Sequence, residues 1–238
     1  MKCEYAKGSN SIAIMQPYFF PYIGYFQLIQ AVDLFIIYDD VNYINRGYVN
    51  RNSILVNGVA HQITLALSHA SQNKPINKIE IDSNANKILK TIEMAYKKSP
   101  QFENVFPMLR DVLLTTEKNL AKMLSSSLQV ITHYLGLKTK FVLSSTIDKD
   151  NTLKSGDKLI EVCRQLGISN YVNSIGGQVL YDKSFFKQRN VDLFFLKTLP
   201  FTYKQFNNTF IPNLSIIDLL MFNEKEQLLH ALQQYTLI

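Results

Sequence analysis

Short apolar runs alternate with longer segments of helical periodicity at the start of the chain. Residues 11–16 are apolar and rich in β-branched side chains, which is typical of a buried strand. Gly24 then opens a segment with apolar residues at helical spacing, and a second apolar run follows at residues 34–40. A strand, a turn, a helix and a strand in such close succession predict a βαβ unit of parallel sheet.

The same pattern returns in the C-terminal part of the chain. Residues 140–145 form an apolar run, residues 155–167 have the spacing of an amphipathic helix that ends at a glycine, and residues 170–177 and 192–197 are again strand-like. These segments therefore predict a second β-α-β arrangement in the same sheet.

The middle of the chain has a different character. Asn57-Gly58 is a hairpin-type turn, so residues 53–56 and 61–67 are expected to pair as antiparallel strands. Helical periodicity follows, and it returns at the end of the chain. The expected helices are one capped by Asp82 or Ser83 that runs through Tyr96, then 102–114, 116–135, 214–222 and 224–235.

Together these elements predict an α/β fold built on a parallel sheet. We expect a Rossmann-like domain of three layers that spans residues 1–238, with a helical insertion at about 84–137. In such sheets ligands bind at the carboxyl ends of the strands. The loops that follow residues 11–16 and 34–40 are therefore the first places to look for function.

Composition narrows the class of protein. Of the 238 residues, 47% are hydrophobic and 18% are charged, which excludes disordered and fibrous chains. No run of about 18 apolar residues occurs, and the first ten residues lack the apolar core of a signal peptide, so a cytoplasmic protein without a membrane span is expected. Cys3 and Cys163 are too few for a disulfide framework or a four-cysteine zinc site.

The formal net charge is +6, and the lysines that produce it are scattered. A dispersed excess of this kind favours a solvated surface, and no nucleic-acid-binding motif accompanies it, so no nucleic-acid partner is expected. The four histidines lack metal-ligand spacing, and no metal site is predicted. The sequence also lacks a P-loop, a G-x-S-x-G motif and a G-x-G-x-x-G motif.

The strand-to-helix turn after residues 11–16 is the first candidate site. A helix N-terminus presents free N–H groups to an anion, and a glycine lets a ligand come close. The turn also resembles the H-x-G-H turn of nucleotidyl transferases, although Tyr22-Ile23-Gly24-Tyr25 lacks both histidines. The alternative is an aromatic turn that packs into the core. The candidate residues are Gln16, Tyr18, Tyr22, Gly24 and Tyr25.

Two acidic residues and a polar loop follow the second apolar run. Asp39 and Asp40 stand where a carboxylate can bind a metal, hold a ribose or act as a general base, and a solvated loop or helix cap is the alternative. Arginines in the next loop are suited to phosphate or carboxylate recognition, with an ordinary surface loop as the alternative. The loop candidates are Asn45, Arg46, Asn50, Arg51 and Asn52.

The end of the segment 170–177 is the last candidate. Its glycine pair permits positive φ angles or close approach of a backbone, and a simple turn is the alternative. These residues would form the opposite wall of a site if the second β-α-β run faces the first. They are Asn173, Ser174, Gly176, Gly177 and Tyr181.

Four stretches together resemble one known family. They are IAIMQPYFFPYIGYFQLI, YDDVNYINRGYVNRNSILVNG, GDKLIEVCRQLG and LSIIDLLMFN. They resemble the WbqC-like family, which is associated with bacterial surface-polysaccharide (O-antigen) biosynthesis, from about residue 11 to the end. The resemblance implies a transferase that places a glycyl or other acyl group on the amino group of a nucleotide-linked amino sugar.

This activity would give the candidate residues specific roles. Asp40, with Asp39 as the alternative, would accept the proton of the amine, and Gln16, Asn50 or Tyr22 would orient the substrate or bind the oxyanion. Arg46 and Arg51 suit a diphosphate, and Tyr18 suits a sugar or base ring. The partners would be the sugar nucleotide and an acyl or aminoacyl donor.

The sequence leaves the cofactor unknown and a homodimer open. Two other functions stay open as well: an ATP-dependent ligase or nucleotidyl transferase on a class I synthetase-like fold, and a non-catalytic module of a polysaccharide-synthesis complex.

Overall fold

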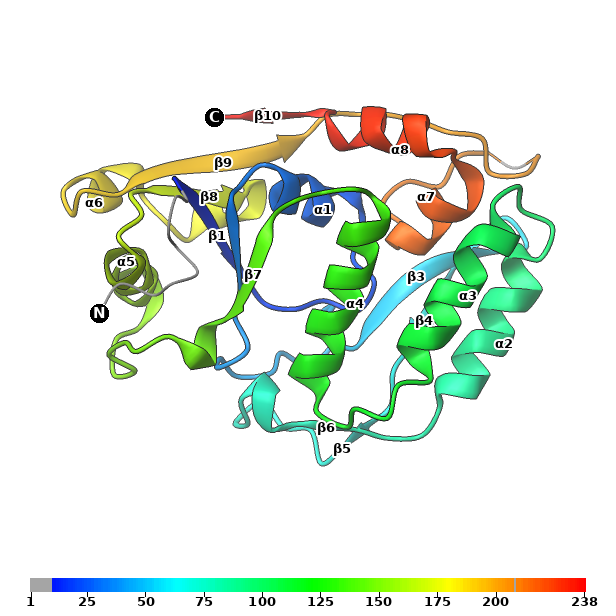
Figure 1. The fold of residues 1–238 in the computed structure, drawn as a ribbon, viewed down its shortest axis with the longest axis horizontal. Coiled ribbons are helices and arrows are strands. Elements are labelled where there is room, and N and C mark those ends of the chain that lie inside the picture. Colours follow the sequence, from blue (N-terminus) through cyan, green and yellow to red (C-terminus); the bar gives the residue numbers. More distant parts are fainter. Residues whose placement is uncertain (1–9, 208) are drawn as a thin grey trace.

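The computed structural model describes residues 10–207 and 209–238 (Figure 1). Cys3 and the N-terminal segment considered for a signal peptide lie outside the described residues, except for Asn10 at its end. The centre of the molecule is a six-stranded sheet. Its strands, in spatial order, are β10 (Tyr235–Leu237), β9 (Asp192–Thr198), β8 (Asn170–Ser174), β1 (Ser11–Met15), β2 (Leu34–Ile37) and β7 (Lys140–Leu143).

The sheet is parallel from β9 to β7, and β10 alone is antiparallel to its neighbour. The chain builds β2 and then β7 outward on one side of β1, and β8 and then β9 outward on the other. The direction of winding therefore reverses at β1. An α/β protein with a mostly parallel sheet is confirmed.

Both faces of the sheet are covered. Neighbouring side chains of a strand point to opposite faces, so each central strand contributes to the packing on both. Ile12 and Ile14 of β1 pack in the cluster that contains α5 (Ser155–Leu166) and α6 (Lys183–Lys187). Ala13 packs in the larger cluster, which contains α1 (Ile23–Gln30) and the C-terminal helices. These helices are α7 (Ile216–Phe222) and α8 (Lys225–Leu232).

The segment between β2 and β7 packs as one body on the same side as α1 (Figure 1). Its expected hairpin is confirmed, because the two strands around Asn57-Gly58 pair in antiparallel fashion. The hairpin consists of β3 (Arg51–Val56) and β4 (Val59–Thr64). The other elements are β5 (Leu67–Ser68), η2 (Ile76–Lys78), β6 (Glu80–Ile81), α2 (Ala85–Tyr96), α3 (Phe102–Leu113) and α4 (Leu120–Tyr134).

A fully buried carboxylate joins this segment to the C-terminal helices. Asp218 of α7 accepts a hydrogen bond from the Tyr96 hydroxyl at 2.7 Å, one from the Tyr203 hydroxyl at 2.6 Å and one from the Gln205 amide at 2.7 Å. The Tyr96 oxygen in turn accepts from the backbone N–H of Leu55 at 2.9 Å. Burial raises the pKa of Asp218, and these hydrogen bonds only partly oppose that effect.

Several expected boundaries were wrong. The strand expected at 34–40 ends at Ile37, where a loop begins. The strand expected at 170–177 ends at Ser174, where a 3₁₀ helix begins. The helix expected from residue 116 begins at Leu120, where Asn119 provides the cap. The cap residue of α2 is Asn84, in place of Asp82 or Ser83, and its side chain bonds to the backbone of Thr64 and Ala66 without capping the helix.

The largest difference concerns the C-terminus. The helix expected at 224–235 ends at Leu232, and the following residues form β10. The apolar periodicity of this segment predicts a helix and carries no information about the edge of β9. Pairing with that edge gives the backbone N–H and C=O groups of the last residues their hydrogen-bond partners.

Candidate functional site

The carboxyl ends of β1 and β8 lie side by side where the winding of the sheet reverses. In open α/β sheets this position is where ligands bind, because the loops after the two strands diverge to opposite faces. A cavity of about 410 Å³ opens there. Its lining is Met15, Tyr18, Pro21, Tyr22, Gly24, Tyr25, Leu28, Tyr48, Asn52, Ser174 and Asn213. We call it the tyrosine cavity.

The segment between β1 and α1 provides much of the lining. Two prolines prevent regular structure after β1, and Tyr22 is the cap residue of α1. The Tyr22 ring folds back over the helix, since a Cβ atom at Gly24 would lie 2.3 Å from the Tyr22 hydroxyl. Gly24 is therefore the residue that lets Tyr22 cover the N-terminus of α1.

The backbone of Phe20 is held in an unfavourable conformation beneath the cavity. Its φ of 42° is uncommon for a bulky residue. Its carbonyl oxygen accepts from the Asn52 amide at 2.8 Å and from the Ser215 hydroxyl at 2.7 Å. Asn52 also donates to the carbonyl of Phe19 at 3.2 Å. Residues from the hairpin and from the start of α7 therefore fix the shape of this turn.

The tyrosines of the cavity form an aromatic cluster. The Tyr18 ring lies 5.5 Å from the Tyr25 ring and 5.9 Å from the Tyr48 ring. The Tyr25 hydroxyl donates to the backbone carbonyl of Gln16 at 2.8 Å. Burial raises the pKa of Tyr18, Tyr22 and Tyr25. Each phenol therefore keeps its proton at neutral pH, and the rings offer surfaces for a planar or sugar ligand.

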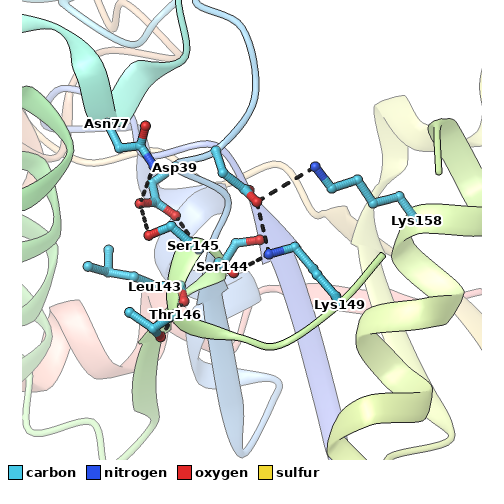
Figure 2. A network of polar contacts seen from close by, with 9 residues as sticks. Asp39, Asn77, Leu143, Ser144, Ser145, Thr146, Lys149 and Lys158 are labelled. Atoms are coloured by element: carbon cyan, nitrogen blue, oxygen red, sulfur yellow. Dashed lines mark hydrogen bonds and ion pairs between the residues drawn. The ribbon is translucent and has the colours of Figure 1, made fainter. Parts of the chain in front are cut away.

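Asp39 has structural partners (Figure 2). Its side chain accepts from the Ser145 N–H at 2.9 Å, from the Ser145 hydroxyl at 2.6 Å and from the Asn77 amide at 3.2 Å. Ser145 belongs to η3 (Ser144–Thr146), which follows β7, and Asp39 is only 1% exposed. Asp39 thus joins the carboxyl ends of β2 and β7 and does not line the tyrosine cavity.

Asp40 is an ion-paired carboxylate. Its oxygen lies 2.9 Å from the ammonium of Lys149 and 3.6 Å from that of Lys158, a residue of α5. Lys149 also donates to the carbonyl of Ser144. Burial acts to raise the pKa of Asp40, but the bonds and charges of Lys149 and Lys158 outweigh it, and the pKa is lowered. A lowered pKa makes a carboxylate a weaker proton acceptor.

The polar loop before β3 is closed on itself. The Arg51 guanidinium donates to the carbonyl of Gly47 at 3.1 Å and to that of Arg46. The Asn50 amide donates to the carbonyl of Leu65, and its oxygen accepts from the Tyr43 hydroxyl. Arg51 and Asn50 therefore use these side-chain groups to hold the loop. Arg46 and Asn45 are exposed.

The residues that follow β8 are divided between the two faces. Ser174 lines the tyrosine cavity, whereas Tyr181 packs in the cluster of α5 and α6. The glycine pair lies in η4 (Ile175–Val179), without positive φ angles. The structure does show a close approach at Gly177, where an added Cβ atom would lie 2.5 Å from the Asn173 side chain. At Gly176 an added Cβ atom would meet no other atom within 4 Å.

Comparison with known proteins places the chain in a protein family. The model of the WbqC-like protein family matches residues 16–230. The chain belongs to this family. A relative in Mycobacterium tuberculosis (strain ATCC 25618 / H37Rv), the uncharacterized protein Rv1507c, is 28% identical over 216 residues, which cover 89% of this chain and 93% of the relative. No solved structure matches the chain.

Two further findings describe this WbqC-like chain. In residues 10–207 and 209–238, no group of three or more His, Cys, Asp or Glu side chains is placed to hold a metal ion. Over the same residues, no helix combines the length and the apolar character needed to cross a bilayer.

Six of the residues singled out in the sequence meet at the tyrosine cavity: Tyr18, Tyr22, Gly24, Tyr25, Asn52 and Ser174. The other lining residues of this WbqC-like protein were missed. Tyr48 lies in a loop whose amides and arginines were the predicted candidates. Asn213 lies far from them in the sequence and belongs to no motif. The two partners of Asp40, Lys149 and Lys158, were missed because a lysine in a polar segment is indistinguishable from a solvated one.

Proposed function

We propose that this WbqC-like protein binds a nucleotide-linked amino sugar in the tyrosine cavity and transfers an acyl group to its amino nitrogen. The observation that carries the proposal is the place and lining of the cavity. It lies at the carboxyl ends of β1 and β8, where the winding reverses, and four tyrosines line it. Aromatic faces with polar tips suit sugar and base rings.

The phenols also suit the chemistry of acyl transfer. An attacking amine turns the carbonyl of the acyl donor into a tetrahedral oxyanion, which neutral hydrogen-bond donors stabilise. Tyr22 keeps its proton because burial raises its pKa, and it faces the cavity at the start of α1. We propose Tyr22 as the donor to this oxyanion. The assignment of the proton acceptor to Asp40 or Asp39 stays a prediction.

Calorimetric titration with UDP-glucosamine, with dTDP-linked amino sugars and with ATP plus Mg²⁺ tests the proposed function. We expect UDP-linked or dTDP-linked amino sugars to bind. Replacement of Tyr48 by alanine should weaken this binding about tenfold, since an aromatic contact contributes about 1.4 kcal/mol. Tyr48 is 61% exposed, so the variant should fold normally.

The matched control is Tyr48→Phe, which keeps the ring and should bind within about twofold of the original protein. Binding of ATP alone would replace the transferase by the ligase hypothesis. If every compound fails to bind, the proposal is wrong and a non-catalytic module is favoured.

Replacement of Gly24 by alanine separates stability from binding. The added methyl group must displace the Tyr22 ring, because the site of its carbon lies 2.3 Å from the Tyr22 hydroxyl. Alanine favours a helix by about 1 kcal/mol over glycine, so we expect an unfolding midpoint no lower than that of the original protein. Binding of the amino-sugar nucleotide should weaken at least about tenfold, as calorimetry would show. Unchanged affinity would contradict a role for Tyr22.

A further inference from the structure

A second cavity, of about 490 Å³, lies beside the first. We call it the loop cavity, because the long connection between β9 and α7 provides most of its wall. Its described lining is Tyr22, Ile23, Ile175, Lys197, Thr198, Leu199, Pro200, Phe201, Thr202, Tyr203, Phe210, Pro212, Asn213, Leu214 and Leu219. No motif in the sequence pointed to it.

The two cavities have a common wall. Tyr22 and Asn213 line both of them. The Tyr22 side chain is held in this position by its packing over Gly24. Two ligands, one in each cavity, would therefore meet at the Tyr22 phenol. A reaction between two substrates requires their reacting atoms to come within about 3–3.5 Å of each other, and cavities with a common wall bring two ligands close together.

The chemistry of the loop cavity differs from that of the tyrosine cavity. Most of its side chains are apolar, with leucine, proline and phenylalanine predominant. Lys197 is exposed and adds a positive charge to the lining, and no carboxylate is among these lining residues. Thr198 and Thr202 add hydroxyl groups. An elongated, largely apolar arm attached to a phosphate group fits such a cavity better than a sugar does.

We propose that the loop cavity binds the acyl donor as a thioester on a phosphate-bearing carrier of the coenzyme A class. This inference rests on the proposed function. The amine nitrogen of the sugar attacks the thioester carbonyl carbon, so a C–N bond forms and the C–S bond breaks. The nitrogen loses one proton, the sulfur leaves with one, and the products are an amide and a free thiol.

The lining residues have separate roles in this proposal. Lys197 pairs with a phosphate of the carrier, and the apolar residues hold its arm. Tyr22, at the common wall, donates a hydrogen bond to the carbonyl oxygen as charge develops on it. The amino sugar occupies the other side of Tyr22, which places the nucleophile and the carbonyl carbon in neighbouring cavities.

Titration of the full chain with acetyl-coenzyme A, and separately with UDP-glucosamine, tests the assignment. Thr202→Trp fills the loop cavity from an exposed position, so it should abolish binding of acetyl-coenzyme A and leave the affinity for UDP-glucosamine unchanged. Lys197→Ala should weaken binding of acetyl-coenzyme A about tenfold through the lost phosphate contact. Lys90→Ala, on the exposed face of α2, removes the same charge and should leave it unchanged.

The outcomes separate the two proposals. If UDP-glucosamine binds and acetyl-coenzyme A does not, the inference about the loop cavity is wrong and the proposed function stands. If Thr202→Trp and Lys197→Ala both bind acetyl-coenzyme A as the original protein does, the donor lies elsewhere and the inference is again wrong. If acetyl-coenzyme A, UDP-glucosamine and the dTDP-linked amino sugars all fail to bind, both proposals fail.

Discussion

Replacement of Asp218 by alanine is expected to lower the free energy of unfolding by about 4 kcal/mol. The carboxylate is fully buried and accepts hydrogen bonds from Tyr96, Tyr203 and Gln205. Alanine removes one acceptor from each of three donors, of which Tyr96 and Gln205 are buried, and each lost partner costs about 1–3 kcal/mol. Urea-induced unfolding at pH 7, followed by circular dichroism, measures the difference.

Asp218→Asn is the matched control. The amide keeps the shape and one acceptor oxygen, so the loss should be about 1–2 kcal/mol. Equal losses for alanine and asparagine would contradict the hydrogen-bonding account, because they would show that the acceptor oxygen kept by asparagine contributes nothing.

The difference in stability between the original protein and Asp218→Asn should change with pH in a defined direction. The pKa of Asp218 is raised in the folded state, so the folded protein holds a proton there more tightly than the unfolded chain. Its contribution to stability is present below the unfolded pKa and is lost as the pH rises through the folded pKa. The original protein should therefore lose stability relative to Asp218→Asn as the pH rises from about 4 towards neutrality.

Replacement of Asp40 by alanine is expected to cost about 3 kcal/mol at pH 7, the lower end of the range for breaking a buried ion pair. The variant leaves Lys149 and Lys158 without their carboxylate, and the Lys149 side chain is only 1% exposed. Urea-induced unfolding measures the loss. Lys187→Ala is the control, since it breaks an exposed pair with Asp192 at 2.6 Å and should cost less than about 1 kcal/mol.

Acid should diminish the effect of the Asp40 variant. The pKa of Asp40 is lowered in the folded state, so its contribution is present above the unfolded pKa and is lost as the pH falls through the folded pKa. The difference between the original protein and Asp40→Ala should shrink as the pH falls below about 4. A difference that persists undiminished there would show that the ion pairs are not its cause.

The same variant also bears on the chemistry. If Asp40 were the proton acceptor, turnover would be lost with little change in stability. If its ion pairs are what matters, stability falls first. Stability and turnover measured on one preparation of Asp40→Ala distinguish these roles.

Local sequence pattern was enough to predict the parallel sheet and the turn at Tyr22. Each depends on neighbours in the chain: alternating apolar runs for β1 and β2, and a proline-bounded turn with a glycine for the start of α1. For the same reason Tyr18, Tyr22 and Tyr25 were found together, because one short segment carries all of them into the tyrosine cavity.

Long-range partners could not be predicted. Asp39 meets Ser145, which is 106 residues away, and Asp218 meets Tyr96, which is 122 residues away. No spacing in the sequence encodes such pairs. Asn52 illustrates the same point. Its amide donates a hydrogen bond to the carbonyl of Phe20, and no sequence pattern near either residue predicts this contact. The loop cavity was missed because apolar and proline-rich connections carry no recognised pattern.

The position of β1 in the sheet has a consequence for synthesis on the ribosome. One edge of β1 pairs with β2, which is the next strand along the chain after α1, but the other edge waits for β8 at residues 170–174. While the intervening chain is being made, a buried apolar strand of the finished sheet presents an unpaired edge, which invites pairing with another chain. Nascent or truncated chains that stop before β8 should therefore depend on chaperones and aggregate without them.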